Sequence, residues 1–174
     1  MRRTSLLTIT ALIVLTPAVE SQTAMTQSKK PAQGSPAAGA APIAVADHEV
    51  GGVEVALVEV KRTSGDSVTI RYRYTNKTNE KKKLDHGGDG LYAWRFAHDA
   101  YYVVVKTSKK YEPLKDENGY PVAANHQQFG SGIMLTPKQV VNTWTKFPAP
   151  APEVEKITIH LPGAPPFDDV ALAK

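Results

Sequence analysis

The chain has 174 residues, of which 41% are hydrophobic and 22% are charged, and it carries a formal net charge of +4 at pH 7. These values are ordinary for a soluble globular protein, and the positive charge is too weak and too scattered to indicate nucleic-acid binding. The sequence contains no cysteine, which excludes disulfides, thiolate metal sites, iron–sulfur clusters and thiol nucleophiles.

The N-terminal residues are typical of an export signal. Arg2 and Arg3 precede an apolar run from Leu6 to Leu15, which is too short to cross a bilayer core of ~30 Å but suits the hydrophobic part of a signal peptide. A general secretory signal fits better than a twin-arginine signal, and an uncleaved membrane anchor is the alternative. We expect cleavage after Ser21, with Ala18 as the second choice, and a periplasmic or secreted protein without a membrane span.

The next segment, residues 22–47, is rich in Ala, Pro, Gly, Ser, Thr and Gln and has no aromatic residue. Such a composition cannot bury enough apolar surface to offset the entropy lost on ordering. The sequence therefore predicts three parts: a signal peptide at 1–21, a disordered linker at 22–47 and one folded domain at 48–174.

The first part of the domain predicts a β-hairpin. Apolar residues alternate from Val53 to Leu57, and the phase changes at Val58, which indicates a bulge. After a turn at 63–66, the clearest strand covers residues 68–75. One face of this strand carries Val68, Ile70, Tyr72 and Tyr74, and the other carries Thr69, Arg71, Arg73 and Thr75. This separation favours a core stripe and a solvated stripe over a nucleic-acid platform of mixed basic and aromatic residues.

Residues 76–91 are polar and rich in lysine and glycine, and they predict a long loop. Beyond this loop, Tyr92, Trp94 and Phe96 alternate with other residues. We expect these three rings to be buried, with an exposed aromatic platform for a ligand as the alternative. An apolar strand follows at 101–105.

The remaining strands are short and separated by turn signals. Asn118 and Gly119 predict a hairpin turn, and further strands are expected at 139–147, 154–161 and 167–172. About seven short strands without a helical stripe indicate an all-β, immunoglobulin-like two-sheet sandwich, with a small barrel as the alternative.

For the strand at 139–147, the sequence does not decide which of the two faces is buried. Val141 and Phe147 lie on one face and Val140 and Trp144 lie on the other, so both faces carry large apolar residues.

Several stretches of the domain together resemble a known family. The stretches are 68–76, 110–114, 135–137, 144–150 and 157–170, and the most specific piece pairs a Phe-Pro-Ala-Pro strand end with a Leu-Pro-Gly-Ala-Pro-Pro-Phe ending. In these residues the chain resembles the telokin-like group of bacterial extracytoplasmic immunoglobulin-like domains of unknown function. The resemblance implies a sandwich outside the cytoplasm and implies no activity, because the fold hosts many functions.

The sequence shows no convincing catalytic or metal-binding pattern. Asp85, His86 and Asp89 match no recognised metal-ligand spacing, and the segment after Asp116 lacks the alternating acidic ligands of a calcium loop. None of the five histidines has the i, i+4 spacing of a zinc protease. We therefore predict no catalytic residues, no metal and no cofactor.

These observations favour a non-enzymatic interaction module that binds a protein or a cell-envelope polymer rather than nucleic acid. The candidate binding loop consists of Lys81, Lys82, Lys83, His86 and Asp89, because a mobile polar loop on a rigid scaffold is a common recognition site. The alternative is a metal-binding or enzymatic protein that uses residues 85–99.

Overall fold

The computed structural model describes residues 41–84, 97, 99–124 and 133–173. The predicted signal peptide, most of the predicted linker and the rings of Tyr92, Trp94 and Phe96 lie outside these residues. In the part of the chain that the structure describes, no helix is long and apolar enough to cross a membrane.

Two four-stranded antiparallel sheets form the domain. The first has the order β1-β2-β3-β8 and consists of β1 (Ala44–Asp47), β2 (Val53–Thr63), β3 (Ser67–Asn76) and β8 (Val140–Pro148). The second has the order β10-β9-β5-β6 and consists of β10 (Phe167–Ala171), β9 (Lys156–His160), β5 (Tyr101–Val104) and β6 (Lys109–Tyr111). A single-turn helix, η1 (Val105–Thr107), follows β5.

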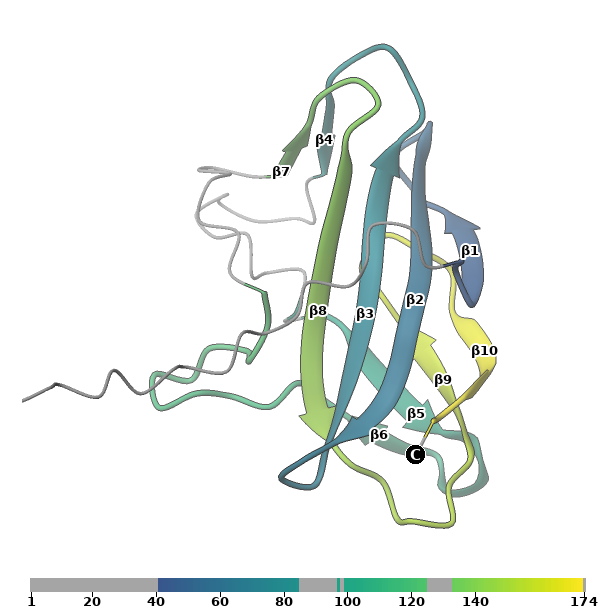
Figure 1. Cartoon of the computed structure of the whole chain (residues 1–174), viewed down its shortest axis with the longest axis vertical. Helices are drawn as coiled ribbons and strands as arrows, with labels where there is room; N and C mark the ends of the chain where they lie inside the picture. Colours follow the sequence, from purple (N-terminus) through teal and green to yellow (C-terminus); the bar gives the residue numbers. More distant parts are fainter. Residues whose placement is uncertain (1–40, 85–96, 98, 125–132, 174) are drawn as a thin grey trace, which may run out of the picture. The chain divides into compact units, whose positions relative to one another are not determined.

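A separate two-stranded ribbon pairs β4 (Lys82–Leu84) with β7 (Ile133–Leu135). Figure 1 shows β8, β3 and β2 in front, with β9 and β5 behind them. The predicted all-β sandwich is confirmed. The described residues form ten strands rather than about seven, since β4, β6 and β7 are only three residues each.

The register confirms the predicted hairpin. β2 and β3 pair from Val53 opposite Asn76 to Thr63 opposite Ser67, and the register shifts between Leu57 and Glu59, which places the bulge at Val58. In the turn, Gly65 has a φ of 74°, a left-handed backbone conformation that glycine adopts without steric cost.

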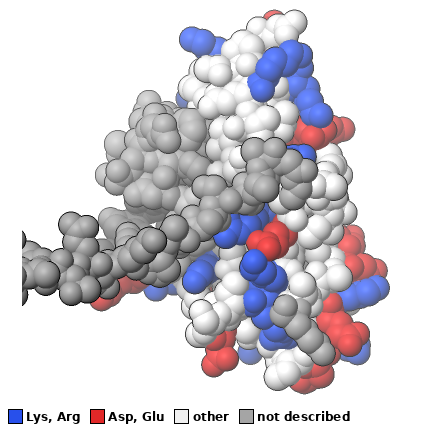
Figure 2. All heavy atoms as spheres, viewed as in Figure 1, with Lys and Arg blue, Asp and Glu red and all other residues white. Residues whose placement is uncertain are grey.

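The first sheet begins earlier than the domain boundary that the sequence predicts. β1 pairs with β2 over Ala44–Asp47, inside the range 22–47 assigned to the linker. Ala44 and Ala46 pack against the core, whereas Ile43 and Val45 are exposed. The outward face of this sheet is charged: Figure 2, in the same view as Figure 1, shows Lys, Arg and acidic side chains over β8, β3 and β2.

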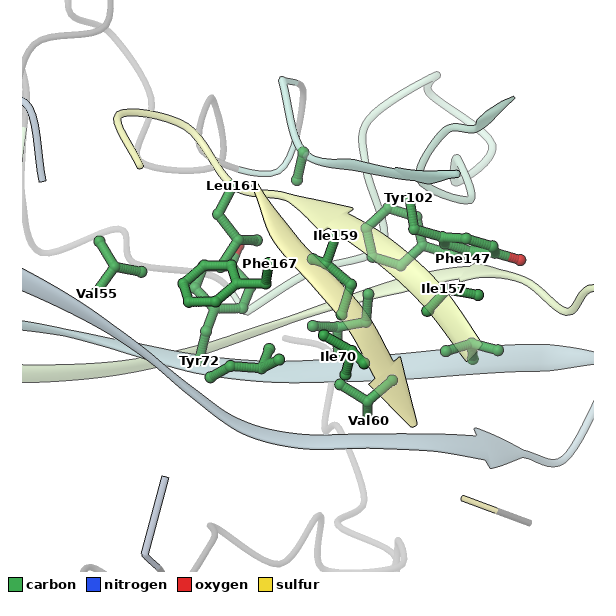
Figure 3. Close-up of a cluster of buried hydrophobic side chains, with 14 of the residues drawn as sticks. Val55, Val60, Ile70, Tyr72, Tyr102, Phe147, Ile157, Ile159, Leu161 and Phe167 are labelled. Carbon is green, nitrogen blue, oxygen red and sulfur yellow. The ribbon is translucent and has the colours of Figure 1, made fainter. Parts of the chain in front are cut away.

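The core lies between the two sheets, and its side chains come from both (Figure 3). Phe147 from β8 contacts Tyr102 from β5 with ring centroids 5.7 Å apart. The hydroxyls of the buried tyrosines find partners: Tyr102 donates to the Pro148 carbonyl oxygen (2.6 Å), and Tyr72 shares a 3.0 Å hydrogen bond with Thr145. Burial raises the pKa of Tyr72 to about 12. Neutral, hydrogen-bonded tyrosines can therefore fill the core without an unpaired polar group.

The structure decides which face of β8 is buried. Val141, Thr143, Thr145 and Phe147 point inward. Val140 is 49% exposed, and Trp144 is half-buried on the outward face. The pairing of β8 with β3 produces this choice, because Val141 lies opposite the inward-facing Tyr74.

Candidate functional site

Three of the five residues predicted for the binding loop lie in the described structure. Lys81 immediately precedes β4, and Lys82 and Lys83 lie on it. The sequence predicts a loop here, and the structure corrects that prediction because β4 pairs with the distant strand β7. The other two residues, His86 and Asp89, lie outside the described residues.

The pairing of β4 with β7 sets the direction of the lysine side chains. Leu84 and Leu135 are buried at 3% and 0% exposure, which anchors the ribbon to the core. Side chains alternate along a strand, so Lys83 points to the opposite, solvent side, where it lies in register with Met134. Met134 is itself 41% exposed. Lys82 is half-buried and its Nζ lies 3.5 Å from a Glu80 carboxylate oxygen.

Asn76, at the end of β3, holds this region together. Its side chain is fully buried, and Nδ2 donates to the carbonyl oxygens of Glu80 (2.7 Å), Leu135 (3.2 Å) and Thr136 (2.9 Å). Its Oδ1 accepts from the backbone N–H and the hydroxyl of Thr78, at 2.9 and 2.7 Å. One side chain thus joins the β3–β4 connection to the β7–β8 connection.

The β7–β8 connection brings a further lysine to the same place. Lys138 has a φ of 60°, its backbone N–H donates to the Thr78 carbonyl oxygen (3.3 Å), and its Nζ donates to the Lys77 carbonyl oxygen (2.6 Å). The Nζ of Lys77 pairs with the Glu54 carboxylate at 2.8 Å. Side chains from two connections therefore meet at one end of the domain.

We call this group the lysine-rich end, and it consists of Lys77, Lys81, Lys82, Lys83 and Lys138. Within this group, Glu54 pairs with Lys77 and Glu80 pairs with Lys82. Figure 2 shows blue side chains gathered at the upper end of the view, where β4, β7 and the connections from β3 and into β8 lie in Figure 1. Ammonium groups are hydrogen-bond donors with full charge, so this surface suits an anionic ligand.

Sequence reasoning located Lys81, Lys82 and Lys83 from their charge run but missed Lys138 and the role of Asn76. A signal for Asn76 was present. It continues the period-two series of inward residues that begins at Val68. A polar residue in phase with the core indicates a buried hydrogen-bonding role.

The described residues contain no group of three or more His, Asp or Glu side chains placed to hold a metal ion. The alternative hypothesis, a metal-binding or enzymatic protein that uses residues 85–99, rests mostly on residues outside the described ranges and stays a prediction. No protein-family model, curated protein or solved structure matches this chain. The telokin-like resemblance also stays a prediction, and function must be inferred from the site itself.

Proposed function

We propose that this chain is an exported, non-enzymatic interaction module that binds an anionic component of the cell envelope through its lysine-rich end. The observation that carries the proposal is the convergence of five lysines from two connections and one short strand. The export signal expected at residues 1–21 supports a place of action outside the cytoplasm.

The rigid support of these lysines favours recognition over a merely solvated charge run. Asn76 and the β4–β7 pairing hold the backbone beneath the lysines, so less conformational entropy is lost on binding. Each exposed ammonium that meets an anion in water contributes on the order of 1 kcal/mol. Several such contacts together give a useful and salt-dependent affinity.

The test is retention of the purified chain on isolated cell-envelope material. The double variant Lys81→Ala/Lys83→Ala removes two exposed charges of the site, and we expect it to lose roughly 2 kcal/mol of binding free energy, about 30-fold in affinity. The matched control, Lys106→Ala/Lys115→Ala, removes the same charge from exposed positions after β5 and β6. It should bind like the wild type.

Salt provides a second readout. Raising ionic strength from about 0.05 M to about 0.5 M should weaken retention of the wild type, because exposed charges are screened over a shorter distance. Both double variants should unfold at the wild-type denaturant midpoint, since exposed lysines contribute little to stability. Equal retention of the folded Lys81/Lys83 variant and the wild type would refute the lysine-rich end as the binding site.

A further inference from the structure

The outward face of the first sheet carries a second group of cations, most of which lie outside the lysine-rich end. Tyr72, Tyr74 and Asn76 point into the core, so the alternating residues Arg71 and Arg73 of β3 point outward. Lys77 reaches the same face, because its Nζ pairs with Glu54 on β2 at 2.8 Å. Three cations thus follow one another along β3 and the residue that follows it.

Neighbouring strands add two more cations. Lys61 on β2 and Lys146 on β8 lie in register on the two sides of Thr69. We call these two lysines, together with Arg71, Arg73 and Lys77, the basic track. From the Thr69 row to Lys77, which lies one residue beyond β3, the track spans eight residue steps, roughly 26 Å at a rise of about 3.3 Å per residue. In Figure 2, blue side chains lie over the middle and lower parts of β8, β3 and β2 as well as at the upper end.

Two carboxylates organise the track without neutralising it. Glu59 pairs with Lys61 at 2.7 Å and with Arg71 at 2.8 Å, and the hydrogen bond from Lys61 lowers the pKa of Glu59. Glu54 pairs with Lys77. Among the described residues, Arg73 and Lys146 have no carboxylate partner.

A third carboxylate of this face, Asp47, lies on the edge strand β1, opposite Glu54. The face therefore keeps an excess of positive charge, and this charge is arranged along a line rather than around a pocket. A linear array of charges matches a ligand with repeated anionic groups better than it matches a single small anion.

We propose that the basic track binds a linear anionic glycan of the cell envelope, which lies along β3 and reaches the lysine-rich end. This proposal rests on the proposed function and gives its ligand a chemical class. Lys77 belongs to both surfaces, so one extended polymer can contact the track and the lysine-rich end together. Contacts made in series along one chain raise the affinity without any strong individual contact.

The distribution of aromatic residues favours a glycan over a nucleic acid. Single-stranded nucleic acids are held by aromatic side chains on which successive bases stack. Here Tyr72 and Tyr74 are buried in the core, and the outward rows of β2, β3 and β8 carry a single aromatic ring, the half-buried Trp144, in register with Arg71. One flat apolar surface beside a line of cations suits a sugar ring bearing an acidic group.

The test is a calorimetric titration of the purified chain with polygalacturonate, digalacturonate, neutral dextran and a single-stranded DNA of matched charge. We expect polygalacturonate to bind at least about ten-fold more tightly than digalacturonate, because only the polymer spans the track. Dextran should not bind, and the DNA should bind more weakly than polygalacturonate.

The variant Arg73→Gln/Lys146→Gln removes the two track cations without a carboxylate partner among the described residues, and we expect it to weaken polymer binding by about ten-fold or more. Its slope of log affinity against log salt should fall by roughly one for each cation removed. The matched control for the track is Lys106→Ala/Lys109→Ala, which removes two exposed cations from η1 and β6 and should leave both quantities unchanged.

The outcomes separate this inference from the proposed function. Loss of polymer affinity in both the track variant and the Lys81/Lys83 variant supports the track. If only the Lys81/Lys83 variant weakens binding, or if the dimer binds as tightly as the polymer, the track is refuted and the lysine-rich end stands. If only the track variant weakens binding, the lysine-rich end is refuted as the site. Tighter binding of DNA than of polygalacturonate overturns the glycan assignment.

Discussion

Replacing Asn76 by alanine removes the side chain that joins the β3–β4 connection to the β7–β8 connection. The side chain is fully buried and makes five polar contacts, three as a donor to carbonyl oxygens and two as an acceptor from Thr78. An amide has two N–H donors, so the three carbonyls share them and the side chain supplies about four effective hydrogen bonds.

The expected cost follows from these bonds. A typical intramolecular hydrogen bond contributes a net of about 1 kcal/mol, and a buried polar group left unpaired costs more. The Glu80 carbonyl and the Thr78 amide are only partly buried, so water can replace the lost partner there. We expect Asn76→Ala to lower the free energy of unfolding by roughly 3 kcal/mol and the melting temperature by about 10 °C.

The measurement is urea unfolding followed by circular dichroism. Asn142→Ala is the matched control, because Asn142 is an exposed asparagine on the outward face of the same sheet, and it should change stability by no more than about 0.5 kcal/mol. Asn76→Asp keeps the acceptor but faces the carbonyl oxygens with a carboxylate, so at pH 7 it should cost at least as much as alanine. An Asn76→Ala variant as stable as Asn142→Ala would contradict the bridging role.

Two further predictions concern the core. Phe147→Ala should lower the free energy of unfolding by about 3–5 kcal/mol, because it leaves a cavity at a fully buried position. Val140→Ala, at a position 49% exposed, should change it by no more than about 0.5 kcal/mol. Equal effects of the two variants in thermal unfolding would contradict the assignment of the buried face of β8. Burial raises the pKa of Tyr72 from 10.0 to about 12, so the unfolded state loses this proton first and stability should fall as pH rises from 10 towards 12. Tyr72→Phe should reduce this alkaline loss of unfolding free energy by up to about 1.4 kcal/mol per pH unit, as measured by urea unfolding at several pH values. A slope equal to that of the wild type would count against the pKa shift.

The local pattern of the sequence determined the β2–β3 hairpin. Strict alternation from Val68 to Tyr74 admits only one inward face, and the phase change at Val58 predicts the bulge that the register shows. The turns also follow from local chemistry: Gly119 has a φ of 81°, and Asp116 Oδ1 accepts from the backbone N–H groups of Asn118 and Tyr120. Such features depend on neighbours in the chain, so the sequence alone reveals them.

Other features arose only from contacts between distant segments. The face of β8 depended on its pairing with β3, because Val140 and Trp144 are as apolar as Val141 and Phe147. β4 is a strand because β7 pairs with it, and no local pattern in a run of three lysines predicts that partner. The basic track joins cations from β2, β3 and β8, which are adjacent only because of sheet order. The sequence by itself determined the class of fold and its local turns, whereas only tertiary pairing decided which charges lie side by side, since that depends on strands far apart in the chain.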